Sequence, residues 1–136
     1  MTDFRRVTDA FSVAPQMDVS DLAAAKASGF KTIICNRPDH EGGPDQPTIE
    51  AMKTEAESLG LSFLALPFSG APSLEIASQL GSLADAAEQP VLAYCRSGTR
   101  SITAWALSQR GQGLASDIIQ AARDAGYDLS GLADYL

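Results

Sequence analysis

The residues whose types and spacing most clearly suggest chemistry are a cysteine and an arginine in the stretch VLAYCRSGTRS. Cys95 follows a short apolar run, Gly98 comes three residues later, and Arg100 comes five residues later, where a helix is expected to begin. Successive backbone N–H groups in such a turn can point at a common centre, and a helix N-terminus adds partial positive charge. The sequence therefore predicts a loop that holds an anion and favours the thiolate form of Cys95 near neutral pH.

Other residues of this loop have matching uses. Arg100 carries a planar fork that can bind two oxygens of one anion, Gly98 permits the tight turn, and Arg96 is expected to steer substrates. Further hydrogen-bond donors are expected from the hydroxyl groups of Ser97, Thr99 and Ser101. A lone cysteine is more often a small buried residue, but the order strand, Cys, Gly, Arg and helix favours Cys95 and Arg100 as catalytic residues.

A second polar loop, 36–47, is rich in Pro, Gly and Asp. Arg37 could orient an anion or tie this loop down, and structural anchoring is the preferred interpretation for both Arg37 and Asp39. Asp45 lies in a Gly-Pro-Asp turn and is the better candidate for a proton donor. His40 has no evident partner and is interpreted as a solvated loop residue.

Two further residues are interpreted as core. Cys35 ends the strand before the second loop and could face Cys95 as a resolving thiol, but a free cysteine is commonly buried, and we favour that interpretation. Trp105 lies at helical spacing from Ile102 on the helix after the Cys95 loop. This spacing favours packing in the core over contact with substrate.

Hydrophobic periodicity predicts helices that alternate with short apolar strands. The expected helices are Ser20–Gly29, with Ser20 as N-cap, Thr48–Gly60, Ser73–Ala87, Ser101–Arg110 and Ser116–Ala125. The expected strands are Phe30–Cys35, Leu61–Leu66 and Val91–Tyr94, with possible edge strands at Phe4–Val7 and Phe11–Ala14. This alternation predicts a three-layer α/β domain, covering residues 1–136, with a mostly parallel sheet between helices.

In such sheets ligands bind at the carboxyl ends of the strands. Three loops should therefore meet at one edge: 36–46, 67–72 and 95–100. The chain has 136 residues with 17 Asp and Glu against 10 Lys and Arg, so no basic surface for nucleic acid or anionic lipid is expected. No stretch resembles a signal peptide or a membrane span, and the cytoplasm is the expected location. The sequence leaves the oligomeric state open.

The stretch YCRSGTRS closely resembles the active-site loop of single-domain rhodaneses and also the phosphate-binding loop of cysteine-dependent protein phosphatases. Over nearly its whole length, through IICNRPDHEGGPDQPT, LPFSG and AYCRSGTRS, the chain is similar to the bacterial family called beta-lactamase hydrolase-like protein, phosphatase-like domain. This resemblance implies a protein-tyrosine-phosphatase-like fold, a nucleophile that matches Cys95 and a loop arginine that matches Arg100. It does not imply β-lactamase activity, because the chain has one histidine and therefore lacks a metal-binding His cluster.

The chain departs from the protein phosphatases in two ways. Their loop has C-x5-R spacing after a histidine, whereas here the spacing is C-x4-R after Tyr94, and the stretch 67–72 contains no carboxylate to act as general acid. Sulfur transfer needs no such acid, because its leaving groups depart as stable anions. The leading expectation is therefore a sulfurtransferase that works through a Cys95 persulfide.

Two alternatives stay open at this stage. One is phosphomonoester hydrolysis through a phosphocysteine, and the other is a non-catalytic module that senses an oxyanion or an oxidant. The expected partner is a small anion, such as thiosulfate, a persulfide or a phosphate ester. Neither a metal nor an organic cofactor is expected.

Overall fold

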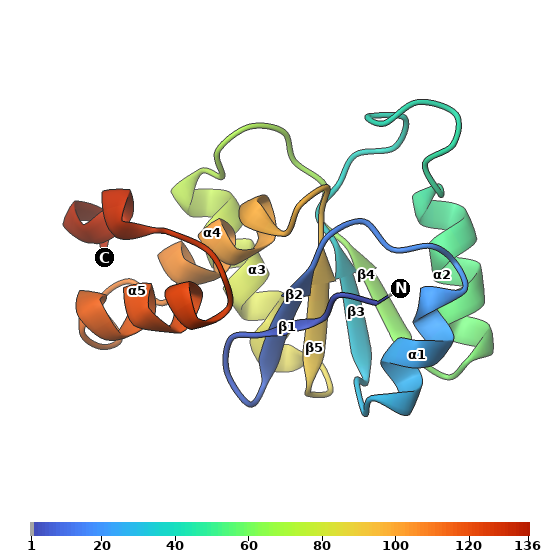
Figure 1. Cartoon of the computed structure of the whole chain (residues 1–136), viewed down its shortest axis with the longest axis horizontal. Coiled ribbons are helices and arrows are strands. Elements are labelled where there is room, and N and C mark those ends of the chain that lie inside the picture. Colours follow the sequence, from blue (N-terminus) through green and yellow to red (C-terminus); the bar gives the residue numbers. More distant parts are fainter. Residues whose placement is uncertain (1) are drawn as a thin grey trace.

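The computed structural model describes residues 2–136, which form a five-stranded sheet between two layers of helices (Figure 1). The strand order is β1-β2-β5-β3-β4, and only β1 among these strands runs antiparallel to its neighbour. The strands are β1 (Arg5–Arg6), β2 (Phe11–Ala14), β3 (Thr32–Cys35), β4 (Ser62–Ala65) and β5 (Val91–Tyr94). The prediction of a mostly parallel α/β sheet is confirmed.

Helices cover both faces of the sheet. They are α1 (Asp21–Ala27), α2 (Ile49–Ser58), α3 (Leu74–Ala86), α4 (Thr99–Ser108), α5 (Ala115–Asp124) and the short 3-10 helix η1 (Ser130–Tyr135). Helices α1 and α2 pack against one face, while α3, α4 and α5 contribute to the core on the other (Figure 1). The three-layer arrangement therefore buries β2, β3 and β5 from both sides, while the edge strand β4 is partly exposed.

Side chains of the central strands alternate between these two cores. In β5, Leu92 and Tyr94 point to the core that contains α1 and α2, whereas Val91 and Ala93 point to the core that contains α3 and α4. This double burial explains why the strands are continuous apolar runs and not alternating ones. It also means that neighbouring residues at a strand end face opposite sides of the sheet.

Several local expectations were wrong. Strand β2 is not an edge strand: it lies between β1 and β5 and is buried along its whole length. Ser20 makes no side-chain cap at α1, because its backbone is already helical, with φ −65° and ψ −24°, and not extended as an N-cap requires. Helix α4 begins at Thr99, two residues before the predicted start, and η1 was not predicted.

The ends of three strands are tied together by Asn36, which is fully buried. Its backbone N–H donates to the Tyr94 carbonyl at 2.8 Å, and its side-chain amide donates to the Leu66 carbonyl at 3.0 Å. Its side-chain oxygen accepts a hydrogen bond from the Ser101 hydroxyl at 2.8 Å. One residue, through its backbone and its side chain, therefore links the carboxyl ends of β3, β4 and β5 to the first turn of α4.

We expect Asn36→Ala to lower the free energy of unfolding by about 2 to 4 kcal/mol, because it leaves the buried Leu66 carbonyl and Ser101 hydroxyl without these hydrogen bonds. Urea denaturation followed by Trp105 fluorescence measures this loss. Gln112→Ala is the control, since it removes an amide whose single hydrogen bond is exposed. Equal effects of the two substitutions would show that the Asn36 network does not hold the strand ends together.

Candidate active site

Cys95 lies directly after β5 and is 1% exposed. The Gly98 N–H donates a hydrogen bond to its Sγ atom at 3.1 Å. Gly98 has φ 91°, in the left-handed region that favours glycine, and it stands at the N-cap of α4. The expected turn is therefore present: the sulfur lies near the start of α4, where backbone N–H groups and the helix dipole favour negative charge.

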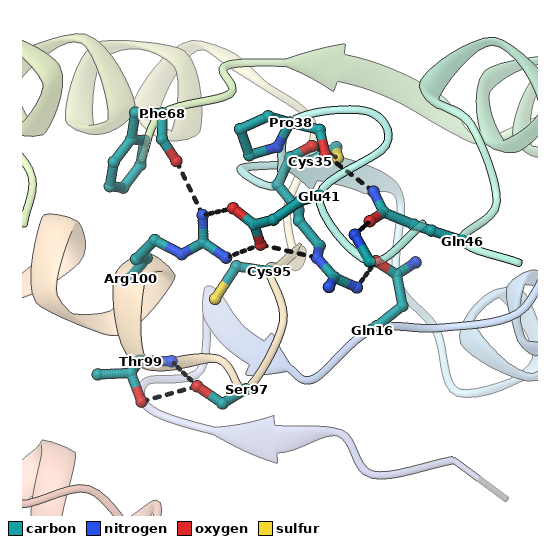
Figure 2. Close-up of polar contacts among 12 residues, drawn as sticks. Gln16, Cys35, Pro38, Glu41, Gln46, Phe68, Cys95, Ser97, Thr99 and Arg100 are labelled. Atoms are coloured by element: carbon teal, nitrogen blue, oxygen red, sulfur yellow. Dashed lines mark hydrogen bonds and ion pairs between the residues drawn. The ribbon is translucent and has the colours of Figure 1, made fainter. Parts of the chain in front are cut away.

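Arg100 reaches across this loop to the two other loops of the same sheet edge (Figure 2). Its Nη1 and Nη2 atoms donate to the two carboxylate oxygens of Glu41 at 2.8 and 2.5 Å, and Nη1 also donates to the Phe68 carbonyl at 3.0 Å. The three loops that were predicted to meet are in direct contact here. The fork of Arg100 holds a carboxylate in the arrangement suited to an oxyanion.

Glu41 lies between two arginines. Its Oε1 atom also accepts a hydrogen bond from the Arg37 Nε at 2.9 Å. The hydrogen bonds from Arg100, supported by Arg37, lower the pKa of Glu41 from its usual 4.5 to about 2. In turn, hydrogen bonding to Glu41 and the proximity of Cys95 raise the pKa of Arg100. Glu41 is therefore ionised and Arg100 is cationic at neutral pH.

Sequence reasoning missed Glu41. The available signal was its place in the loop 36–46, already assigned to the same edge as Cys95. Nothing in the spacing indicated which carboxylate of this loop would turn towards Arg100.

The other residues of that loop have mainly structural contacts. Arg37 is 7% exposed and, besides Glu41, its Nη1 donates to the Gln16 side-chain oxygen at 3.2 Å. Asp39 accepts a hydrogen bond from the Ile49 N–H at 2.8 Å and so holds the first turn of α2. Anchoring, the preferred interpretation of both residues, agrees with these contacts. Asp45 and His40 are exposed on the same loop.

The three hydroxyl groups that follow Cys95 differ in exposure: two lie at the surface and one is buried. The hydroxyls of Ser97 and Thr99 hydrogen-bond to each other at 3.0 Å at the exposed rim, beside the exposed Arg96. Ser101 is fully buried and donates to Asn36. This corrects the expectation that the Ser101 hydroxyl lines the anion site: helical phase turns it into the core.

Cys35 forms no disulfide with Cys95. It belongs to the core beneath α1 and α2, and its thiol donates to the Arg37 carbonyl at 3.3 Å. Burial raises the pKa of this thiol. Trp105 is 7% exposed and stacks on Phe11 with ring centroids 6.2 Å apart, so it is a core residue, as predicted.

The fold defines a class: this is a protein-tyrosine-phosphatase-like α/β domain, with a cysteine at the start of the turn that leads into α4. PTPMT1, solved with PI(5)P, superimposes with a TM-score of 0.74 at 16% sequence identity, covering 98% of this chain and 91% of that one. Tk-PTP in its active form gives 0.69 at 18% identity, with 98% of each chain covered. At these identities the similarity establishes the fold.

Closer relatives establish the family. The family model "Beta-lactamase hydrolase-like protein, phosphatase-like domain" matches residues 3–112, and the chain belongs to this family. A beta-lactamase hydrolase-like protein of Agrobacterium fabrum is 33% identical over 135 residues, which cover 96% of this chain and 31% of the relative. A candidate phosphatase of Neisseria meningitidis, nma1982, has a TM-score of 0.85 at 32% identity, covering 96% of this chain and 93% of that one.

The chain therefore spans about a third of the length of the curated relatives it matches. Within residues 2–136, no helix has both the length and the apolar character needed to cross a membrane.

The Glu41 ion pairs generate a pH-dependent prediction. A carboxyl whose pKa is lower in the folded protein stabilises it above the unfolded pKa, and this contribution disappears as the pH falls from about 4.5 towards 2. We expect wild-type protein to lose about 1 kcal/mol more stability than Glu41→Gln between pH 5 and pH 2, allowing for solvent screening. Urea denaturation at several pH values measures the difference. Glu57→Gln, at an exposed position of α2, should follow the wild-type curve.

Proposed function

We propose that this chain is a cysteine-dependent phosphatase that hydrolyses phosphate monoesters through a phosphocysteine at Cys95. The observation that carries this proposal is the shared geometry of the loop: the sulfur of Cys95, the Gly98 N–H and the guanidinium of Arg100 lie around one helix start. Membership of a phosphatase-like family supports the same reading.

The reaction has two steps. The Cys95 thiolate attacks phosphorus, so that an S–P bond forms while the ester O–P bond breaks and the alcohol departs as its anion, which then takes a proton from solvent. Water then attacks the phosphocysteine, which releases inorganic phosphate and restores the thiolate. Loop N–H groups and Arg100 stabilise the charge on the phosphoryl oxygens in both steps.

Substrate binding requires an exchange at Arg100. The guanidinium fork is occupied by Glu41 in this structure, and a phosphate group needs the same donors. An incoming dianion can take this place because it carries more charge than the carboxylate and also receives the N–H groups of the loop. Glu41 keeps its hydrogen bond from Arg37 during this exchange.

The site contains no evident group that could donate a proton to the leaving alcohol. The stretch 67–72 contains no carboxylate, Asp39 is engaged at α2, and Glu41 with its pKa of about 2 is ionised. Asp45, the proton donor suggested by the sequence, stays a prediction. We therefore propose that the preferred substrates are esters whose alcohol departs readily as an anion, as aryl phosphates do.

Comparison with known proteins favours phosphate over sulfur. The short loop and the lack of an acid favour sulfur transfer, but the relatives are phosphatase-like and support the alternative. Two proteins of the same fold were solved with phosphoesters, TpbA of P. aeruginosa with pTyr and PTPMT1 with PI(5)P. Sulfur transfer and a non-catalytic sensor become outcomes of the test.

We expect wild-type protein to hydrolyse p-nitrophenyl phosphate, and Cys95→Ser to lower kcat by at least about a thousandfold, because a serine hydroxyl is a poor nucleophile without a base. Phosphate release measures this directly. Cys35→Ser is the matched control and should keep nearly full activity, since Cys35 faces the other core. A Cys95 persulfide formed from thiosulfate, without phosphate release, would support sulfur transfer; the absence of both reactions would indicate a sensor.

The missing acid gives a second expectation for this function. Across a series of esters, kcat/KM should fall steeply as the pKa of the leaving alcohol rises, by at least about 100-fold from p-nitrophenyl phosphate to an alkyl phosphate, which is the contribution that a general acid would otherwise make. Steady-state kinetics at constant pH measure the slope. If kcat/KM does not change with the pKa of the leaving alcohol, the site contains a proton donor, and Asp45 becomes the first candidate.

A further inference from the structure

Tyr127 reaches the Cys95 loop from the C-terminal part of the chain. Helix α5 ends at Asp124, and Gly126, with φ 99°, turns the chain back towards the sheet. The Tyr127 ring is then buried, with 9% of the residue exposed, and its hydroxyl donates to the Ser97 carbonyl at 2.8 Å. A residue 30 positions downstream therefore holds the turn that contains Cys95.

This hydrogen bond acts on a peptide unit that itself contacts the sulfur. The Ser97 carbonyl and the Gly98 N–H belong to the same trans peptide, so they point in opposite directions. Because Tyr127 holds the carbonyl outward, the N–H points inward, where it donates to Cys95 Sγ at 3.1 Å. A hydrogen bond on one end of a peptide also polarises the other end and strengthens its donor.

Gly98 is needed for the contact between Tyr127 and the loop as well as for the tight turn. A Cβ atom at this position would lie 2.1 Å from the Tyr127 hydroxyl oxygen and 3.0 Å from its ring carbon Cζ. The absence of a side chain at Gly98 therefore allows the ring to approach the loop.

Tyr127 is kept as a neutral donor. Burial raises the pKa of its hydroxyl, which is therefore protonated at neutral pH. Arg5 lies with its guanidinium carbon 5.1 Å from the ring centroid and is paired with Asp3 at 3.0 Å. This cation covers the ring and fixes its orientation.

We propose that Tyr127 is a positioning residue for Cys95: its hydroxyl holds the Ser97 carbonyl so that the Gly98 N–H stays directed at the sulfur and at any anion bound beside it. This role rests on the proposed function of Cys95 as nucleophile. Tyr127 lies outside residues 3–112, the part of the chain that the family model matches.

Other charged and titratable groups also surround Cys95. Arg100 approaches from α4, with Glu41 and Arg37 behind it on the β3–α2 loop, and Cys35 at the end of β3 is close enough to interact electrostatically with Cys95. Tyr127→Phe leaves all of these in place. A change in the behaviour of the sulfur in this variant therefore reports on the hydroxyl.

The test follows iodoacetamide alkylation of Cys95 against pH, in a Cys35→Ser background so that one thiol reacts. For Tyr127→Phe we expect the midpoint of the rate curve to move upward by about 0.5 to 1 pH unit, because the thiolate has a weakened donor. With p-nitrophenyl phosphate, kcat should fall by about three- to tenfold and KM should change less. Tyr135→Phe, at a tyrosine that is 67% exposed, is the control and should match the background in both assays.

A Tyr127→Phe curve that superimposes on that of the background would overturn the proposal, even if the melting temperature falls, because a purely structural role lowers stability without moving the midpoint. Alkylation does not depend on the substrate. If the midpoint shifts while wild-type protein hydrolyses no phosphate ester, the role of Tyr127 stands and the phosphatase function fails.

Discussion

Parallel pairing of β3 with both of its neighbours is the constraint on which the site depends. Cys35 lies opposite Ala65 in β4 and opposite Tyr94 in β5, so three strands end at the same level. The segments that follow must then diverge from one edge, and their backbone polar groups need partners there. Asn36 satisfies several of them at once, which is why a fully buried amide is found at this position.

Charged side chains of opposite sign also gather where the carboxyl ends of the parallel strands meet. The protein carries a net charge of −7, yet positive charge gathers beside the turn that contains Cys95. Arg100 and Arg37 provide this charge, and Glu41 compensates it in the structure described here. The buried cations are thereby kept paired, which avoids the high cost of an isolated charge in a partly desolvated place.

The elements were largely predictable because their signals are local. Val91–Tyr94 was predicted with the observed bounds, since a short apolar run between Pro90 and a polar loop has few alternatives. The place of β2 inside the sheet was not predictable, because periodicity does not specify which strands pair. Conversely, the meeting of the three loops followed from topology and agrees with the contacts of Arg100.

The details of the site depended on tertiary contacts that no local pattern encodes. Glu41 was hidden among other polar residues of its loop, and Tyr127 follows a helix that has no evident link to Cys95 in sequence. Loop length and a missing acid are also indirect signals of the reaction, and they placed sulfur transfer before the phosphatase alternative that the relatives favour. Ser101 differs from these: its burial follows from the helical phase it shares with Trp105, a local pattern that had already placed Trp105 in the core.

The contacts of Cys35 bear on how Cys95 would recover from oxidation. An oxidant converts a thiolate into a sulfenic acid, which is rescued when a neighbouring thiol condenses with it to form a disulfide. The chain has two cysteines, which form no disulfide, and the Cys35 thiol donates to the Arg37 carbonyl in the core beneath α1 and α2. With Cys35 engaged in this way, a small thiol from solution is one route by which oxidised Cys95 would be recovered, in competition with irreversible conversion to the sulfinic acid.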